Sequence, residues 1–290
     1  MVAGGVSGDG ISTVEVLTGD LGTKQLPNLP QNICDSSMAQ HDGMILLCGG
    51  ENNDQKCLKL DHGTWTEHST LNKERYFHSA VATDSATFVF GGSNSRKTYE
   101  YLPMDSNTWI MGKTKIPGGF LAGGAIVVKS GQEIWLIGGL GTEKRILSFN
   151  VNDQTFQVLP SQLNVRRIGH RCAFIPNTKK IMITGGRSFG DGYLNSTEIL
   201  DTEDGSVIMA SPMNSKRRNH GMGVITINGE EKLAVFGGIG GRSVLDSVEI
   251  YNTQTENWET TTIKLKEPKS HFGFLSVKLG DLKTEEFSQF

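Results

Sequence analysis

The chain has 290 residues, of which 37% are hydrophobic and 20% charged, a balance that fits a globular protein and excludes intrinsic disorder. Its formal net charge of −3 excludes a polyanion binder that acts through overall charge, and no apolar run reaches the roughly 18 residues of a transmembrane helix. Glycine is unusually frequent, with 36 residues, which indicates a turn-rich β protein.

A short apolar run that ends in Gly-Gly recurs along the chain. The six doublets begin at Gly4, Gly49, Gly91, Gly138, Gly185 and Gly237. They are therefore 45, 42, 47, 47 and 52 residues apart. A period of this length is typical of one propeller blade made of four strands.

Each repeat predicts four strands in the same order. The first is apolar and opens near a histidine, as in residues 77–83 and 219–227, and a turn such as Asn228-Gly229 joins it to the Gly-Gly strand. The third strand alternates with period two, in residues 13–17, 98–102, 197–200 and 248–251. The fourth often carries an aromatic side chain, namely Trp65, Trp109, Phe156 or Trp258. No segment keeps a period of 3.6 residues, so almost no helix is predicted.

These residues resemble the kelch repeat, whose signature is a Gly-Gly doublet that ends the second strand and an aromatic residue well downstream. The resemblance runs from Val2 to about Leu279, although Val207 stands where one aromatic is expected and the first unit has none. It implies an all-β fold, a six-bladed β-propeller of four-stranded antiparallel blades over residues 1–279.

The two ends of the chain complete this expectation. Residues 2–5 correspond to a second strand, and the segment that starts at His271 corresponds to a first strand. The C-terminal strand is therefore expected to pair into the N-terminal blade and close the ring, which removes exposed sheet edges. Residues 280–290 are predicted to form a loose tail, and the domain is expected to be monomeric.

The arginines gather in two sets of predicted loops, those between strands two and three and those that lead from strand four into the next blade. Both sets emerge on one face of a propeller, around the channel mouth. The predicted binding residues are Arg75, Arg96, Arg145, Arg167, Arg187, Arg217, Arg218 and Arg242. Arg166 and Arg171 lie beside them, with Lys73, Lys144, Lys216 and Lys269.

Because a guanidinium grips carboxylates bidentately, this rim predicts a protein-binding module that recognises an acidic peptide or protein segment. Kelch domains that look like this one commonly bind acidic segments there, as scaffolds or adaptors. Reversal of Arg167 and Arg217 to Glu is then expected to abolish binding. Another interpretation stays open, since Arg75, Arg167 and Arg217 each precede a histidine by three residues and could instead satisfy loop carbonyls or pair with acids.

No catalytic residue, metal ligand or cofactor is predicted. His78, His170, His220 and His271 recur once per repeat at what looks like one blade position, so they are expected to lie a blade apart, too far to share a metal ion. The alternative function is a sugar-acid mutarotase, as in similar kelch propellers, or another carbohydrate-binding propeller. A nucleic-acid partner is not expected, because no stripe of alternating basic and aromatic residues is present, and no membrane partner is expected either.

Two signals bear on the compartment. Cys48 ends a second strand and Cys57 lies on the third strand of the same repeat, so a cross-strand disulfide is possible and would indicate an oxidising environment. Asn195 begins an N-x-T sequon. The first residues lack the basic and apolar regions of a signal peptide, and the resemblance favours a cytoplasmic protein.

Overall fold

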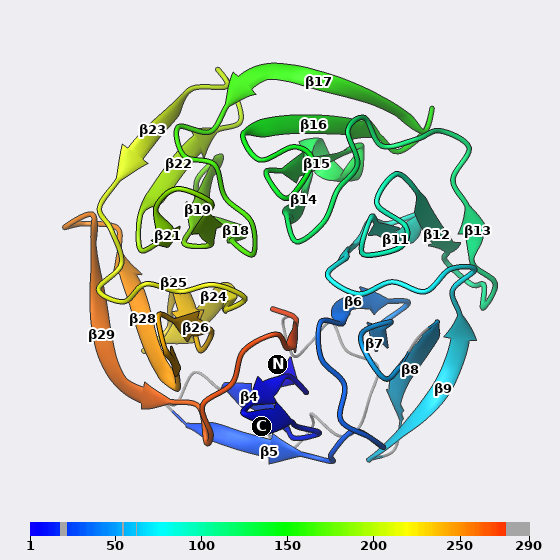
Figure 1. Ribbon diagram of the computed structural model, residues 1–290, viewed down its shortest axis with the longest axis horizontal. Helices are drawn as coiled ribbons and strands as arrows, with labels where there is room; N and C mark the ends of the chain where they lie inside the picture. The colour runs from blue at the N-terminus through cyan, green and yellow to red at the C-terminus, as the bar shows by residue number, and fades with distance from the viewer. Residues whose placement is uncertain (18–21, 54, 62, 277–290) are drawn as a thin grey trace.

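The computed structural model describes residues 1–17, 22–53, 55–61 and 63–276. In this part of the chain, six four-stranded antiparallel sheets stand around a central axis like the blades of a propeller (Figure 1). The predicted fold class is confirmed. The predicted tail, residues 280–290, and the boundary at 279 lie outside the described residues.

The blades are numbered here from the one that holds the N-terminus. Blade 1 consists of β30 (Gly273–Phe274), β1 (Val2–Ala3), β4 (Val14–Leu17) and β5 (Thr23–Leu26). Blade 2 consists of β6 (Ser37–His41), β7 (Met44–Cys48), β8 (Lys56–Asp61) and β9 (Thr64–Thr70). Blade 3 consists of β10 (Ser79–Ala82), β11 (Ala86–Phe90), β12 (Tyr99–Pro103) and β13 (Ile110–Met111).

The other half of the ring follows the same plan. Blade 4 consists of β14 (Gly124–Val128), β15 (Glu133–Ile137), β16 (Arg145–Asn150) and β17 (Thr155–Gln162). Blade 5 consists of β18 (Arg171–Phe174), β19 (Lys180–Thr184), β22 (Thr197–Asp201) and β23 (Val207–Ala210). Blade 6 consists of β24 (Gly221–Ile227), β25 (Glu230–Phe236), β28 (Ser247–Asn252) and β29 (Asn257–Lys264).

Three consecutive blades carry an extra hairpin between their second and third strands. These hairpins are β2 (Val6–Ser7) with β3 (Asp9–Gly10), β20 (Arg187–Ser188) with β21 (Gly192–Tyr193), and β26 (Ile239–Gly240) with β27 (Ser243–Val244). The single helical turn among the described residues is the 3-10 segment η1 (Lys129–Gly131). The face that carries the loops between second and third strands therefore has additional hairpins over blades 5, 6 and 1 and none over blades 2, 3 and 4 in the described chain.

The predicted ring closure is confirmed. In blade 1, β30 pairs antiparallel with β1, with Phe274 opposite Val2 and Gly273 opposite Ala3. The amino group of Met1 also donates to the carbonyl of Leu275 at 2.8 Å. Pairing of the two ends leaves no inner strand of the ring without a neighbour.

The core is divided among the junctions between blades. The buried apolar side chains of the described chain form six clusters, and each cluster joins two neighbouring blades. Between blades 3 and 4, for example, Phe90, Tyr99 and Phe149 lie with ring centroids 4.9–5.6 Å apart. Such contacts between alternating strand residues hold each blade at a fixed angle to the next.

The Gly-Gly doublets are required because the next loop crosses them closely. Gly91 has φ +67°, and a Cβ built there would lie 2.0 Å from the carbonyl oxygen of Phe120 in the following loop. Gly92 has φ +95°, and its amide donates to the same oxygen at 3.0 Å. Only glycine fits both the conformation and the contact.

Candidate functional site: the arginine rim and the channel mouth

A closed ring of backbone hydrogen bonds frames the channel mouth. Each blade contributes one residue, and its amide donates to the carbonyl of the corresponding residue in the preceding blade at 2.6–3.1 Å. The six residues have φ between 50° and 66°; they are Asp35, Phe77, Ala122, Gly169, Asn219 and His271. Because hydrogen-bonded backbones lie roughly 5 Å apart, backbones on opposite sides of this six-membered ring lie only about 10 Å apart. The backbone atoms fill part of that span, so a single side chain can enter the ring, whereas a helix of about 10–12 Å cannot.

The ring corrects the expectation for His271. His78, His170 and His220 each follow a ring residue, whereas His271 is itself a ring residue and Phe272 takes the position of the other histidines. The prediction of one repeated position was therefore wrong for His271. Burial lowers the pKa of His78 and of His170 to about 3, so both rings are neutral at physiological pH.

Three of the predicted binding arginines lie inside the blades. Arg75, Arg167 and Arg217 are each 0% exposed. In blade 6, Arg217 Nε and Nη2 donate to Glu249 Oε1 at 3.2 and 2.9 Å, and Nη1 donates to the carbonyls of Gly237 and Ser247. Glu249 also accepts the loop amides of Asn214 and Ser215.

The other two buried arginines repeat this arrangement. Arg75 donates to Glu100 and to the carbonyl of Gly91, and Arg167 donates to Glu198 and to the carbonyl of Gly185. Burial lowers the pKa of each guanidinium, and the facing carboxylate opposes that shift. These side chains tie each incoming loop to its own blade and cannot reach a ligand, so Arg75, Arg167 and Arg217 are removed from the candidate binding site.

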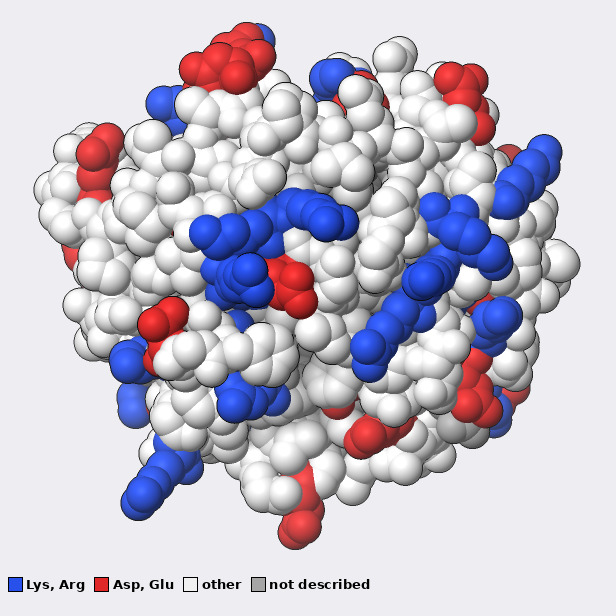
Figure 2. All heavy atoms as spheres, turned by 45° about the horizontal axis from the view of Figure 1, so that its top comes forward, with Lys and Arg blue, Asp and Glu red and all other residues white. Residues whose placement is uncertain are grey.

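The remaining predicted arginines do lie on the loop face. Arg96, Arg145, Arg187 and Arg242 are exposed, and Arg218 is half-buried. Arg166, the neighbour of Arg167, is exposed as well. In the described part of the chain, no ion pair involves any of these six side chains. Figure 2 shows Lys and Arg side chains in two groups around the centre of this face. We call these six residues the arginine rim.

One part of the rim spans blades 3 and 4. Gly118 and Gly119 in the connecting loop lie between two arginines, because a Cβ at Gly118 would be 3.6 Å from Arg145 Nη1 and one at Gly119 would be 3.2 Å from Arg96 Cβ. Arg96 and Arg145 thus flank the same glycine pair. These glycines leave open space beside the Arg145 guanidinium and the stem of the Arg96 side chain.

The other part of the rim spans blades 5 and 6. The backbone of Arg187 pairs with that of Ile168, two residues after Arg166, and Arg187 lies opposite Tyr193 in the β20–β21 hairpin. The guanidinium carbon of Arg218 lies 5.8 Å from the centroid of the Tyr193 ring, within cation–π range. Arg187 and Arg218 therefore both lie at this hairpin, and Arg166 belongs to the loop that pairs with its first strand.

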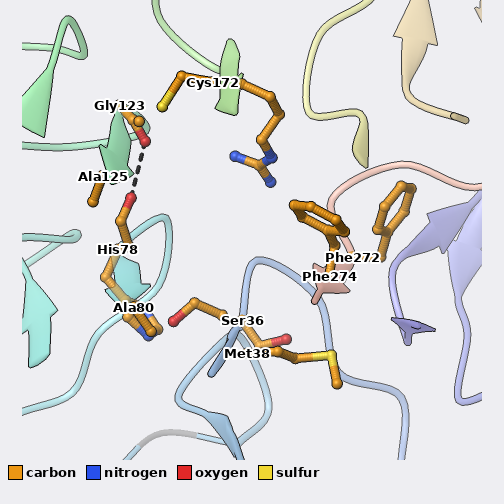
Figure 3. A pocket seen from close by; sticks show the side chains of 13 residues that line it. Ser36, Met38, His78, Ala80, Gly123, Ala125, Cys172, Phe272 and Phe274 are labelled. Carbon is orange, nitrogen blue, oxygen red and sulfur yellow. Dashed lines mark hydrogen bonds between the residues drawn. The ribbon is translucent and has the colours of Figure 1, made fainter. Parts of the chain in front are cut away.

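A cavity of about 90 Å³ lies along the axis between the innermost strands (Figure 3). Its walls include His78, Arg171, Phe272 and Phe274. Among the described residues, neither ring nitrogen of His78 has a hydrogen-bond partner. Arg171, predicted to lie just past His170, thus faces the channel, and the cavity offers polar groups to water or to a small polar molecule.

An acidic cluster that no sequence motif predicted lies beside the ring. The Cys34 thiol donates to Glu51 Oε2 at 3.5 Å, and burial, followed by the charge of Glu51, raises the pKa of Asp35 to about 8. Donor atoms of these three residues lie within 4.8 Å of one another, close enough to share a metal ion. The positive charges of Arg171 and Arg218 act on Asp35 and would oppose a cation, so we assign no metal here.

Both compartment signals can be placed. Cys48 and Cys57 lie directly opposite each other on β7 and β8 and form a disulfide, with Cα atoms 4.1 Å apart. Asn195 is half-buried, and its Nδ2, the atom that a glycan would modify, donates to the carbonyl of Met213 at 3.0 Å. The two cysteines thus lie as the cross-strand disulfide requires, whereas the folded protein does not present Asn195 freely. No helix of the described residues has the length and apolarity to cross a membrane.

Comparisons with known proteins agree with this architecture. No curated protein matches the chain. The solved structure titled "Structure of YjhT" superposes with a TM-score of 0.71 at 14% identity, over 85% of this chain and 88% of that one, which shows a shared fold. The family model described as the KLHDC2/KLHL20/DRC7 kelch-repeats domain matches residues 123–281, more than half of the chain. The chain belongs to this family of kelch-repeat domains.

Proposed function

We propose that this protein binds partner proteins by holding an acidic segment on the arginine rim. Kelch propellers generally act as protein-interaction modules, and their loops are free to vary on a rigid scaffold. The observation that carries the proposal is the set of five exposed arginines around one mouth, with half-buried Arg218 beside them, none of which has an ion-pair partner among the described residues. A protein with net charge −3 has no need of unpaired cations on one face for solubility.

The geometry favours an extended acidic segment. Backbones on opposite sides of the hydrogen-bonded ring are only about 10 Å apart, so a partner would lie across the mouth or insert single side chains. Arg96 and Arg145 lie beside the loop between blades 3 and 4, and Arg166 and Arg187 lie in the loop into blade 5 and in blade 5 itself, so exposed arginines occur at two places along the mouth. Carboxylates spaced along one segment could contact both places at once.

A sugar-acid enzyme has less support. The channel cavity of about 90 Å³ is well below the roughly 300 Å³ at the small end of ligand pockets. Burial also holds the pKa of His78, the one histidine in its wall, at about 3, too low to donate a proton at neutral pH. We therefore place protein binding first.

The test is selection from a display library of random 12-residue peptides. Wild-type protein should enrich peptides rich in Asp and Glu, and their affinity, measured by fluorescence anisotropy, should weaken as salt is raised. A triple variant, Arg166→Glu, Arg187→Glu and Arg242→Glu, should lose this enrichment. Reversal of Arg167 or Arg217 is unsuitable here, because it would place a second carboxylate against a buried one.

A matched control keeps the same change of charge on the opposite face. Lys129, Lys179 and Lys180 lie in or beside turns between first and second strands, which emerge away from the rim. The variant Lys129→Glu, Lys179→Glu and Lys180→Glu should select the same acidic peptides as the wild type. If the rim variant does so too, the proposed function is wrong.

A further inference from the structure

The β20–β21 hairpin presents an apolar side chain among the arginines of the rim. Phe189, in the turn of this hairpin, is 68% exposed, the highest value among the large exposed apolar side chains of the described chain. The others, such as Ile208 and Val158, lie on the outermost strands. Phe189 belongs to none of the hydrophobic clusters, so the fold does not require it.

The surroundings of Phe189 resemble the centre of a protein interface. Arg187 lies two residues before it, and Tyr193 lies opposite Arg187 in the hairpin with the Arg218 guanidinium over its ring. Aromatic residues and arginine are the types most enriched at interface centres and binding hot spots. Asp191, in the same turn, is the one acidic side chain of this hairpin.

We propose that Phe189 is an apolar anchor for the partner, and that the bound segment carries an apolar side chain next to its acidic residues. This inference rests on the proposed function, since the arginines beside Phe189 would hold the acidic part. A purely acidic segment would leave the Phe189 ring in water. A segment with an adjacent Leu, Ile or Phe would bury it and gain affinity from the apolar surface removed from water.

Charge complementarity also fixes the order of contacts. Arg187 and Arg218 both lie beside Tyr193, at the base of the hairpin, whereas Asp191 lies in its turn, so the acidic residues would bind on the Tyr193 side of Phe189, away from Asp191. The recognised pattern is therefore an apolar residue adjacent to Asp or Glu. Neither feature alone should bind as well as the combination.

The same random 12-residue library tests this inference. Wild-type protein should enrich peptides that combine acidic residues with an adjacent apolar one. The variant Phe189→Ser should still select acidic peptides but lose the apolar preference, and its affinity for the best wild-type peptide should fall about 10-fold to 100-fold. Replacement of the peptide's apolar residue by Ser should cost the wild type the same factor and cost Phe189→Ser almost nothing further.

The matched control is Ile208→Ser, which removes an apolar side chain that is 57% exposed on β23, away from the rim. It should leave selection and affinity unchanged. If Phe189→Ser keeps the apolar preference, or if wild-type peptides are acidic without one, the anchor is wrong while the acidic rim stands. If no acidic enrichment occurs at all, the proposed function fails and the anchor with it.

Discussion

Arg166 and Arg167 are neighbours in one loop, yet they occupy opposite environments. Arg167 is 0% exposed and donates to Glu198 and to the carbonyls of Gly185 and Ser196. Arg166 is exposed and takes part in no ion pair within the described residues. The position relative to the following histidine therefore decides the role of an arginine. Arg167, three residues before His170, is a buried structural residue, whereas Arg166, four residues before it, is exposed and available to a partner.

The same buried position differs between blades. The second glycine of each doublet donates to a carbonyl in the next loop, which identifies the equivalent residues as Ile33, Arg75, Phe120, Arg167, Arg217 and Lys269. Four of them are cations that face a glutamate, with Lys269 Nζ 2.5 Å from Glu15 Oε1 in blade 1. In blades 2 and 4, Ile33 shares a cluster with Leu58, and Phe120 shares one with Leu147. The fold thus accepts either a complete ion pair or a complete apolar pair.

The largest predicted effect is the loss of one partner from a buried pair. Arg167→Met leaves the Glu198 carboxylate buried without its cation and should lower the free energy of unfolding by about 3–5 kcal/mol. Arg166→Met should change it by no more than about 0.5 kcal/mol. Denaturant titration of both variants measures the contrast. Equal effects would erase the distinction between the two arginines.

The disulfide gives the next effect, in blade 2, where Ile33 and Leu58 take the place of the buried ion pair. Cys48 and Cys57 are 9 residues apart, and closing a loop of that size stabilises the folded state by about 2–3 kcal/mol through the unfolded chain. The double variant Cys48→Ser and Cys57→Ser should lower the free energy of unfolding by that amount. Reduction of the wild type should have a similar effect, whereas reductant added to the variant should do nothing.

The folding pattern was visible in the sequence because it repeats. Six Gly-Gly doublets at a period in the forties predicted the blades, and the positions of Val2 and His271 predicted the ring closure, which β1 and β30 confirm. Periodicity exposes these features because each blade repeats the same turn chemistry. Periodicity reports only what all blades share, so it predicts the scaffold well and says little about a loop that occurs once.

The division of the arginines into buried and exposed ones could be predicted only in part from the sequence. Each alternating third strand contains a glutamate where an apolar residue would suit a two-sided sheet; these are Glu15, Glu100, Glu198 and Glu249. Such glutamates point to buried cations one loop earlier, and this signal could have removed Arg75, Arg167 and Arg217 from the rim. The acidic cluster at Asp35 had no such signal, since it depends on how the Cys34 and Glu51 backbones pair across the blade.

Replacement of a whole pair should cost less than replacement of one partner. The double variant Arg167→Phe and Glu198→Leu copies Phe120 and Leu147 of blade 4, and exchange of a complete buried ion pair for apolar residues of similar volume is often nearly neutral. It should recover at least half of the stability lost in Arg167→Met, leaving a deficit below about 2 kcal/mol. A double variant as unstable as the single one would mean that the loop amides bound to Glu198 matter more than the charge pair.

The smallest predicted effect is on the pH dependence of stability, and it comes from the buried histidines at the position that Phe272 occupies in blade 1. His78 has a pKa of about 3 when folded, far below its usual 6.5, because burial excludes its charged form. Between these values only the unfolded chain takes up the proton, so stability is complete above about pH 6.5 and falls as the pH drops, by about 1.4 kcal/mol per unit for each such histidine. Asp35, with its raised pKa, acts in the opposite direction as the pH falls from about 8.

The measurement compares wild type with His78→Phe by denaturant titration at about pH 7 and pH 5.5. Both proteins contain Asp35, so its contribution cancels in the comparison. The variant should lose about 1.4 kcal/mol less free energy of unfolding than the wild type on acidification. Parallel losses would mean that His78 stays neutral in the unfolded chain or charged in the folded one, and that its burial between the blades carries no pH dependence.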